Sequence, residues 1–66
     1  MEVVYDNGMY QVKVNRYDNE YLVINVSTDV VESRESAQPT AEYKADALRE
    51  VTIKRNQAKN EIEARR

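Results

Sequence analysis

Residues 4–12 read Val-Tyr-Asp-Asn-Gly-Met-Tyr-Gln-Val, and this stretch decides the first half of the fold. Asn7-Gly8 is a strong hairpin signal, because a type I′ turn needs positive φ at both of its central residues. A two-residue loop pairs Asp6 with Met9 and places Glu2 opposite Lys13. The apolar face of this hairpin then receives Val3, Tyr5, Tyr10, Val12 and Val14. We expect strands at about 2–6 and 9–16.

A second turn is predicted at Tyr17-Asp18-Asn19, followed by a strand at about 21–27. A three-residue loop with Asn19 in the left-handed region adds Leu22, Ile24 and Val26 to the apolar face. A two-residue loop would turn these three side chains to the polar face, so burial favours the longer loop. The open face of the meander then displays Gln11, Lys13, Asn15, Tyr21, Val23 and Asn25.

Residues 28–39 form a connection for which the sequence leaves two alternatives. Asp29 and Glu32 have the spacing of a capping box that would open a short helical turn, or Val30 and Val31 extend the third strand. Pro39 ends this connection, and Thr40 is expected to cap a helix at about 41–64. On a helical wheel, one arc collects Tyr43, Ala47, Leu48, Val51, Ala58 and Ile62.

These elements predict a single α+β domain over residues 1–66, in which a three-stranded antiparallel meander is followed by one long C-terminal helix packed on one sheet face. A helix of this length outruns strands of six or seven residues, so its last turns project beyond the sheet. A 66-residue chain also buries little core. Both features favour a homodimer, through Leu48, Val51, Arg55, Ala58 and Ile62 and through an exposed edge of the third strand.

The composition excludes most catalytic chemistry. The chain has no Cys, no His and a single Gly, which removes thiolate and imidazole chemistry and glycine-rich phosphate loops. We therefore expect no enzyme, no cofactor, no metal site and no small-molecule substrate. No apolar run approaches the ~20 residues that span a bilayer, and the start is acidic where a signal peptide is basic. A cytoplasmic location without membrane contact is the expectation.

Charge is distributed unevenly along the chain. Residues 1–51 hold five Lys or Arg against ten Asp or Glu, whereas residues 52–66 hold five basic residues against two acidic ones. The basic helix end presents Lys54, Arg55 and Lys59. The second turn adds side-chain types that are enriched at interface hot spots, namely Arg16, Tyr17 and Tyr21. These six residues are the candidate partner-binding residues.

Two functions fit this pattern. The favoured one is a small protein–protein interaction module, including the case of a phage or mobile-element protein that inhibits a host protein. The alternative is a nucleic-acid-binding accessory protein that uses the basic C-terminal helix, or stacks bases on Tyr21 of the open sheet face. The acidic sheet argues against this alternative.

Overall fold

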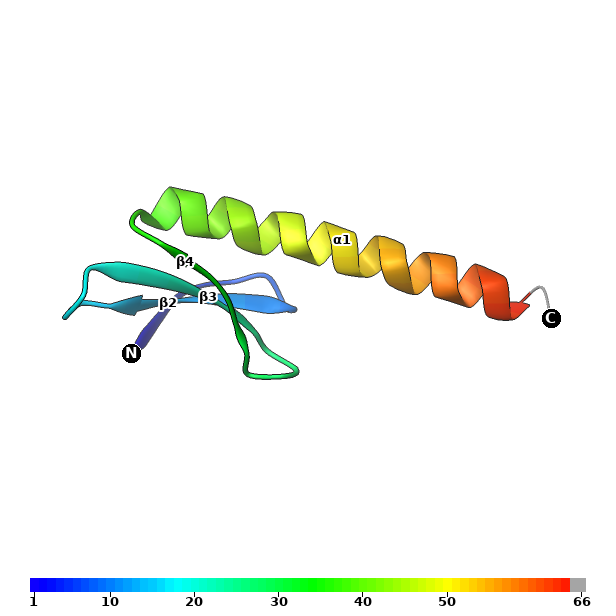
Figure 1. The fold of residues 1–66 in the computed structure, drawn as a ribbon, viewed down its shortest axis with the longest axis horizontal. Helices are drawn as coiled ribbons and strands as arrows, with labels where there is room; N and C mark the ends of the chain where they lie inside the picture. Colours follow the sequence, from blue (N-terminus) through cyan, green and yellow to red (C-terminus); the bar gives the residue numbers. More distant parts are fainter. Residues whose placement is uncertain (65–66) are drawn as a thin grey trace.

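The computed structural model describes residues 1–64 and shows an α+β fold in which one long helix packs against an antiparallel sheet (Figure 1). The sheet contains β1 (Glu2–Asp6), β2 (Tyr10–Asn15), β3 (Glu20–Asn25) and β4 (Val31–Glu35), paired in the order β1-β2-β3-β4. The helix α1 spans Gln38–Ala64. The general class is as predicted, but the predicted three-stranded sheet is wrong because a fourth strand is present.

The fourth strand occupies the segment that was predicted as a connection. After β3, Asn25 reverses the chain: its side-chain Oδ1 accepts hydrogen bonds from the amides of Ser27 and Thr28, and its carbonyl accepts one from Asp29. Asp29 has a φ of 60°, in the left-handed region that Asp tolerates better than most residues. β4 then runs antiparallel to β3, so the segment is neither a short helix nor an extension of β3. The edge of β3 is therefore covered.

The first hairpin has a longer loop than predicted. Asp6 pairs with Gln11 and Tyr5 with Val12, and a bulge at Val4 then brings Val3 opposite Lys13. Gly8 has a φ of 94° but Asn7 is not in the positive region, so the type I′ turn is not formed. The Asn7 side chain instead accepts hydrogen bonds from the amides of Met9 and Tyr10. The bulge moves Val3 away from the apolar face predicted for it.

The second hairpin is also shifted by one residue. Asn19 adopts the predicted left-handed conformation, with a φ of 51°, but four residues separate the strands and Val12 pairs with Val23. The shift exchanges the two faces of β3. Val23 lies fully buried with Val12 against the helix, whereas Leu22 and Ile24 are buried on the opposite face. Cross-strand neighbours of Leu22 are Lys13 and Arg34, whose aliphatic stems are placed to cover it.

The helix begins earlier and uses a different face from the one predicted. The Ala37 carbonyl accepts the Ala41 amide, so α1 starts at Gln38, and Pro39 occupies the first turn, where its missing N–H leaves no bond unmade. Thr40 is thus a helical residue and not the cap. Small side chains face the sheet, since Ala41 and Ala45 are fully buried and Leu48 packs beside them. Of the predicted arc, Tyr43 and Val51 are exposed.

The second half of α1 extends past the sheet, as predicted from its length (Figure 1). The molecule measures 51 × 19 × 14 Å along its principal axes, and the projecting half of α1 accounts for much of this elongation. No 18-residue stretch of α1 within residues 1–64 has the apolarity that a membrane-crossing helix requires.

Candidate functional site

The six predicted site residues do not come together in one place. Arg16 and Tyr17 lie in the β2–β3 turn, at the end of the sheet beside the start of α1 (Figure 1). Lys54, Arg55 and Lys59 lie on the opposite side of the molecule, on the half of α1 that extends past the sheet. These are two separate surfaces, and each has to be judged on its own geometry.

The first surface surrounds Tyr17, whose side chain is 100% exposed. The turn that carries Tyr17 is held by its neighbours: Asn15 Oδ1 accepts the Tyr17 amide at 3.1 Å, and Asn15 Nδ2 donates to Asp18 Oδ2 at 3.1 Å. The Tyr17 ring therefore contributes nothing to forming the turn. An aromatic ring left in water without a role in the fold is typical of an interface anchor.

A hollow of about 340 Å³ lies beside this ring. We call it the Tyr17 surface, and it is lined by Met1, Glu2, Val14, Asn15, Arg16 and Tyr17. Met1 is 76% exposed, while Val14 forms a buried apolar floor. Arg16 Nη2 forms an ion pair with Glu2 Oε2 at 3.0 Å, and both side chains are largely exposed. An exposed pair of this kind is worth at most about 1 kcal/mol, so a partner's carboxylate can replace Glu2 at little cost.

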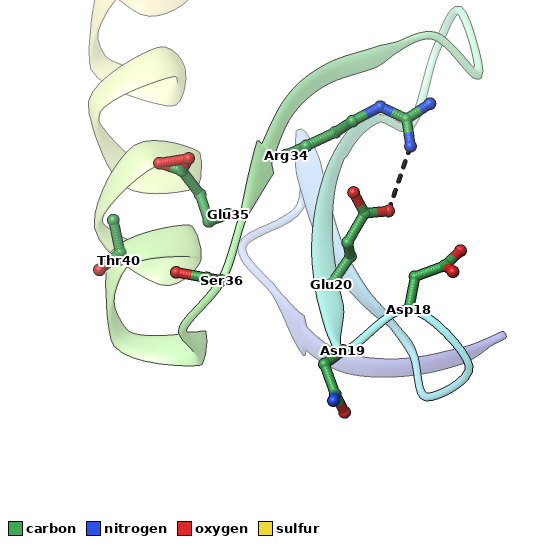
Figure 2. A pocket seen from close by; sticks show the side chains of 7 residues that line it. All are labelled: Asp18, Asn19, Glu20, Arg34, Glu35, Ser36 and Thr40. Atoms are coloured by element: carbon green, nitrogen blue, oxygen red, sulfur yellow. Dashed lines mark hydrogen bonds and ion pairs between the residues drawn. The ribbon is translucent and has the colours of Figure 1, made fainter.

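A second hollow, of about 430 Å³, lies on the other side of the same turn. Figure 2 shows Arg34 of β4 reaching toward Glu20 of β3, and the two form an ion pair of 3.3 Å. The remaining lining residues come from the turn, the end of β4 and the first turn of α1: Asp18, Asn19, Glu35, Ser36 and Thr40. Three carboxylates against one guanidinium give this hollow a negative charge, which suits a basic side chain of a partner.

The second predicted surface is the projecting half of α1, residues 53–62. Lys54, Arg55 and Lys59 are exposed there, and none of them forms an ion pair with a carboxylate among residues 1–62, whose side chains the structure describes. Arg65 and Arg66, which the charge count assigns to the same basic end, lie outside the described residues. The surface is a single helix with water on most sides, and none of its residues lines either of the two hollows described above.

The direction of the projecting half is set by contacts at the middle of α1. Asp46 Oδ1 accepts hydrogen bonds from the side-chain Nδ2 of Asn7 at 3.0 Å and from the Tyr5 hydroxyl at 2.7 Å. The Asn7 bond, followed by the Tyr5 bond, lowers the pKa of Asp46 below its ordinary value of 3.8. The same bond to Asp46 raises the pKa of Tyr5 above 10.0. In the turn, bonds from Gln11 and from the Gly8 amide lower the pKa of Asp6.

One predicted site residue is misplaced. Tyr21 was expected on the open sheet face, but the one-residue shift of β3 puts it opposite Val14 and Glu35, half-buried and packed against the core. It is therefore not available for stacking on bases. The residues that sequence reasoning missed, Met1 and Val14, carry no motif; only the position of the turn relative to the chain start brings them beside Tyr17.

Within residues 1–64, no group of three or more Asp and Glu side chains has a geometry suited to a metal ion. No family model matches the chain, and no curated protein or solved structure matches it either.

Proposed function

We propose that this chain is a cytoplasmic, non-enzymatic protein-binding module that engages its partner through the Tyr17 surface. One observation carries the proposal: Tyr17 is fully exposed on a turn that its own side chain does not help to form. Tyr, Arg and Met are enriched in the cores of protein interfaces, and here Tyr17, Arg16 and Met1 border one hollow. The acidic hollow on the other side of the turn extends the same surface.

A partner that fits this end of the molecule has a shallow apolar pocket for the Tyr17 ring and an acidic group for Arg16. It also carries a Lys or Arg that reaches the hollow containing Asp18, Glu20 and Glu35. The specific form of the function that we expect from the sequence is inhibition of a host protein, as phages and mobile elements use it.

The test begins with affinity capture of the partner on the immobilised chain, followed by measurement of its dissociation constant with purified components. Tyr17→Ala is expected to weaken binding about 30-fold or more, the effect of losing a hot spot of about 2 kcal/mol. Arg16→Glu should also weaken binding. Circular dichroism should show both variants folded.

Val30→Ala is the control, because Val30 is another exposed apolar side chain and lies in the turn between β3 and β4, away from both surfaces. Tyr43→Ala is compared with it, because Tyr43 is an exposed tyrosine of the helix. Unchanged affinity of Tyr17→Ala, with loss of affinity in Tyr43→Ala, would overturn the proposal and move the site to the helix. Inhibition is read separately, as loss of the partner's activity when the wild-type chain is added.

The alternative function is nucleic-acid binding by the projecting half of α1. The three exposed cations Lys54, Arg55 and Lys59 favour it, since none of them is neutralised by a carboxylate in the described part of the chain. Binding through three phosphates would fall with salt at a slope of roughly −2 to −3 in log–log form. Fluorescence anisotropy with a labelled duplex of about 20 base pairs, at salt concentrations from about 50 to about 200 mM, measures this slope. The result separates nucleic-acid binding from the favoured function.

A further inference from the structure

The helix carries two apolar stripes, and the sheet covers only one of them. The covered stripe consists of Ala41, Ala45 and Leu48, with Thr52 at its end. Rotated by about 120° around the helix axis, a second stripe runs along positions Tyr43, Ala47, Val51, Lys54, Ala58 and Ile62. Its large members are exposed: Tyr43 by 76%, Val51 by 47% and Ile62 by 61%. We call these six positions the outer stripe.

The spacing of the outer stripe is symmetric about its centre. Successive positions are separated by four, four, three, four and four residues, so the order is unchanged when the helix is read backwards. Reversal exchanges Tyr43 with Ile62, Ala47 with Ala58 and Val51 with Lys54. Large residues stand at the two ends and small ones inside them. A surface with this property is complementary to itself under a twofold axis perpendicular to the helix.

We propose that the outer stripe is the interface with a second copy of this chain, packed as an antiparallel pair of α1 helices. In this pair Tyr43 lies on Ile62 of the second copy, and Val51 lies on the aliphatic stem of its Lys54. Ala47 meets Ala58 of the second copy, and two alanines let the helix axes approach to the short end of the usual 8–10 Å. The contact runs for about 30 Å along each helix.

Charge complementarity selects the antiparallel arrangement. Glu50 borders the outer stripe beside Lys54, and reversal brings Glu50 of each copy close to Lys54 of the other, so four charges of alternating sign surround the twofold axis. A parallel pair would instead place Lys54 against Lys54 in the seam and leave Tyr43 opposite Tyr43. Like charges in a seam are destabilising. The antiparallel pair also lays each basic helix end beside the acidic body of the other copy.

The second copy supplies what the single domain lacks. The core beneath α1 has only five buried residues, Tyr10, Val12, Val23, Ala41 and Ala45, and the projecting half has no sheet beneath it. A helical segment as short as residues 53–62 is marginally stable in water when nothing packs against it. Packing along residues 43–62 of a second copy therefore stabilises the half of α1 that extends past the sheet. This interface is distinct from the Tyr17 surface, because none of the residues that line the Tyr17 surface belongs to the outer stripe.

Engineered cysteines test the orientation, because the natural chain has none. Ala47→Cys and Ala58→Cys are made as single variants, mixed in equal amounts and oxidised. The mixture is expected to form a covalent dimer, while each single variant alone forms little. Within one helix the two positions are roughly 16 Å apart and cannot bridge. A higher yield of covalent dimer from either single variant alone than from the mixture overturns the antiparallel arrangement.

Sedimentation equilibrium tests the association itself. The wild type is expected to sediment as a dimer at micromolar concentration, and a 7.7 kDa monomer at all concentrations overturns the proposal. Glu50→Lys should weaken dimerisation by about tenfold or more, since it surrounds the axis with four positive charges. The exchanged variant with both Glu50→Lys and Lys54→Glu should dimerise like the wild type. Equal weakening in the single and the exchanged variant would show that these charges do not meet.

Discussion

The Tyr5 hydroxyl donates a hydrogen bond of 2.7 Å to Asp46 Oδ1, and this bond ties the edge strand β1 to the middle of α1. The two residues are 41 positions apart in the sequence. Asn7 adds a second donor to the same oxygen from the adjacent turn. Tyr5 and Asn7 thus hold α1 at Asp46, and the Tyr10–Thr52 contact holds it again before residues 53–62 project, so these contacts together fix the direction of the projecting half.

Acid should weaken this attachment. The folded-state pKa of Asp46 is lowered, so its contribution to stability is fully present above about pH 3.8 and is lost as pH falls through the lower folded value. Thermal unfolding is measured from about pH 6 to about pH 2 in steps of about 0.5 pH units. The melting temperature of the wild type should fall as the pH drops below about 3.8. Asp46→Asn should show a shallower fall. Some slope remains in the variant, since Asp6 also has a lowered pKa.

The control for this prediction is Glu32→Gln, on a side chain of β4 that is exposed and makes no side-chain hydrogen bond within residues 1–64. Its acid profile should match that of the wild type. At the alkaline end the sign is opposite: the raised pKa of Tyr5 gives stability that is present below pH 10.0 and is lost above it. Identical acid slopes for Asp46→Asn and the wild type would contradict the bond.

Substitution of Gly8 should destabilise the fold through backbone strain alone. Gly8 has a φ of 94°, which side chains of L-residues rarely adopt, but an added Cβ would meet no atom within 4 Å. We expect Gly8→Val to lower the free energy of unfolding by about 1 kcal/mol or more, and Gly8→Asn to cost clearly less, because Asn tolerates positive φ. Urea unfolding of both variants measures the difference. Equal losses would point to a steric cause that the geometry does not contain.

Val23 separates the observed register from the predicted one. It is fully buried against the helix, so Val23→Thr places a hydroxyl in the apolar core and should cost about 1–3 kcal/mol. The predicted register put Val23 on the open face, where this change would be nearly silent. Val3→Thr is the control, since Val3 is about half exposed and should change stability by less than about 0.5 kcal/mol. Urea unfolding of both variants distinguishes the two registers.

The sequence predicts the elements of this fold better than their register. Period-two alternation and the turn residues locate β1, β2 and β3 to within one or two positions, and the absence of Gly and Pro after Pro39 locates α1. Loop length is a finer property. Asp6 and Asn7 use their side chains to bond backbone amides of the turn, and residues 7–9 separate β1 from β2 where Asn-Gly alone suggests a two-residue loop. Each added residue exchanges the faces of the next strand.

Strand β4 and the sheet-facing side of α1 could not be predicted for a different reason. β4 is polar and largely exposed, and backbone pairing with β3 forms it without any apolar alternation. On the helix, the large residues suggested the arc from Tyr43 to Val51, but the sheet is met by Ala41 and Ala45 because small side chains allow closer packing. Of the residues in the predicted arc, Leu48 packs against the core, whereas Tyr43, Val51 and Ile62 are left exposed on the outer stripe.

The candidate site was predictable in part. The exposure of Arg16 and Tyr17 follows from a polar turn, and that of Lys54, Arg55 and Lys59 from helix length, so sequence reasoning located all five. Sequence reasoning could not divide these five residues between two surfaces, because the division depends on the direction in which α1 crosses the sheet. Tyr21 was predicted on the open sheet face, but the shifted register of β3 places it on the side that packs against the helix.

A double-mutant cycle on Tyr10 and Thr52 measures how firmly the end of the covered stripe is held. The hydroxyls of these side chains lie 3.0 Å apart, and Tyr10 is buried. Tyr10→Phe removes one partner and should cost about 0.5–1.5 kcal/mol, and so should Thr52→Val. The double variant should lose less than the sum of the two, because neither hydroxyl is then left without its partner. Additive losses would show that the bond does not form in solution, and α1 would then separate from the sheet before Thr52.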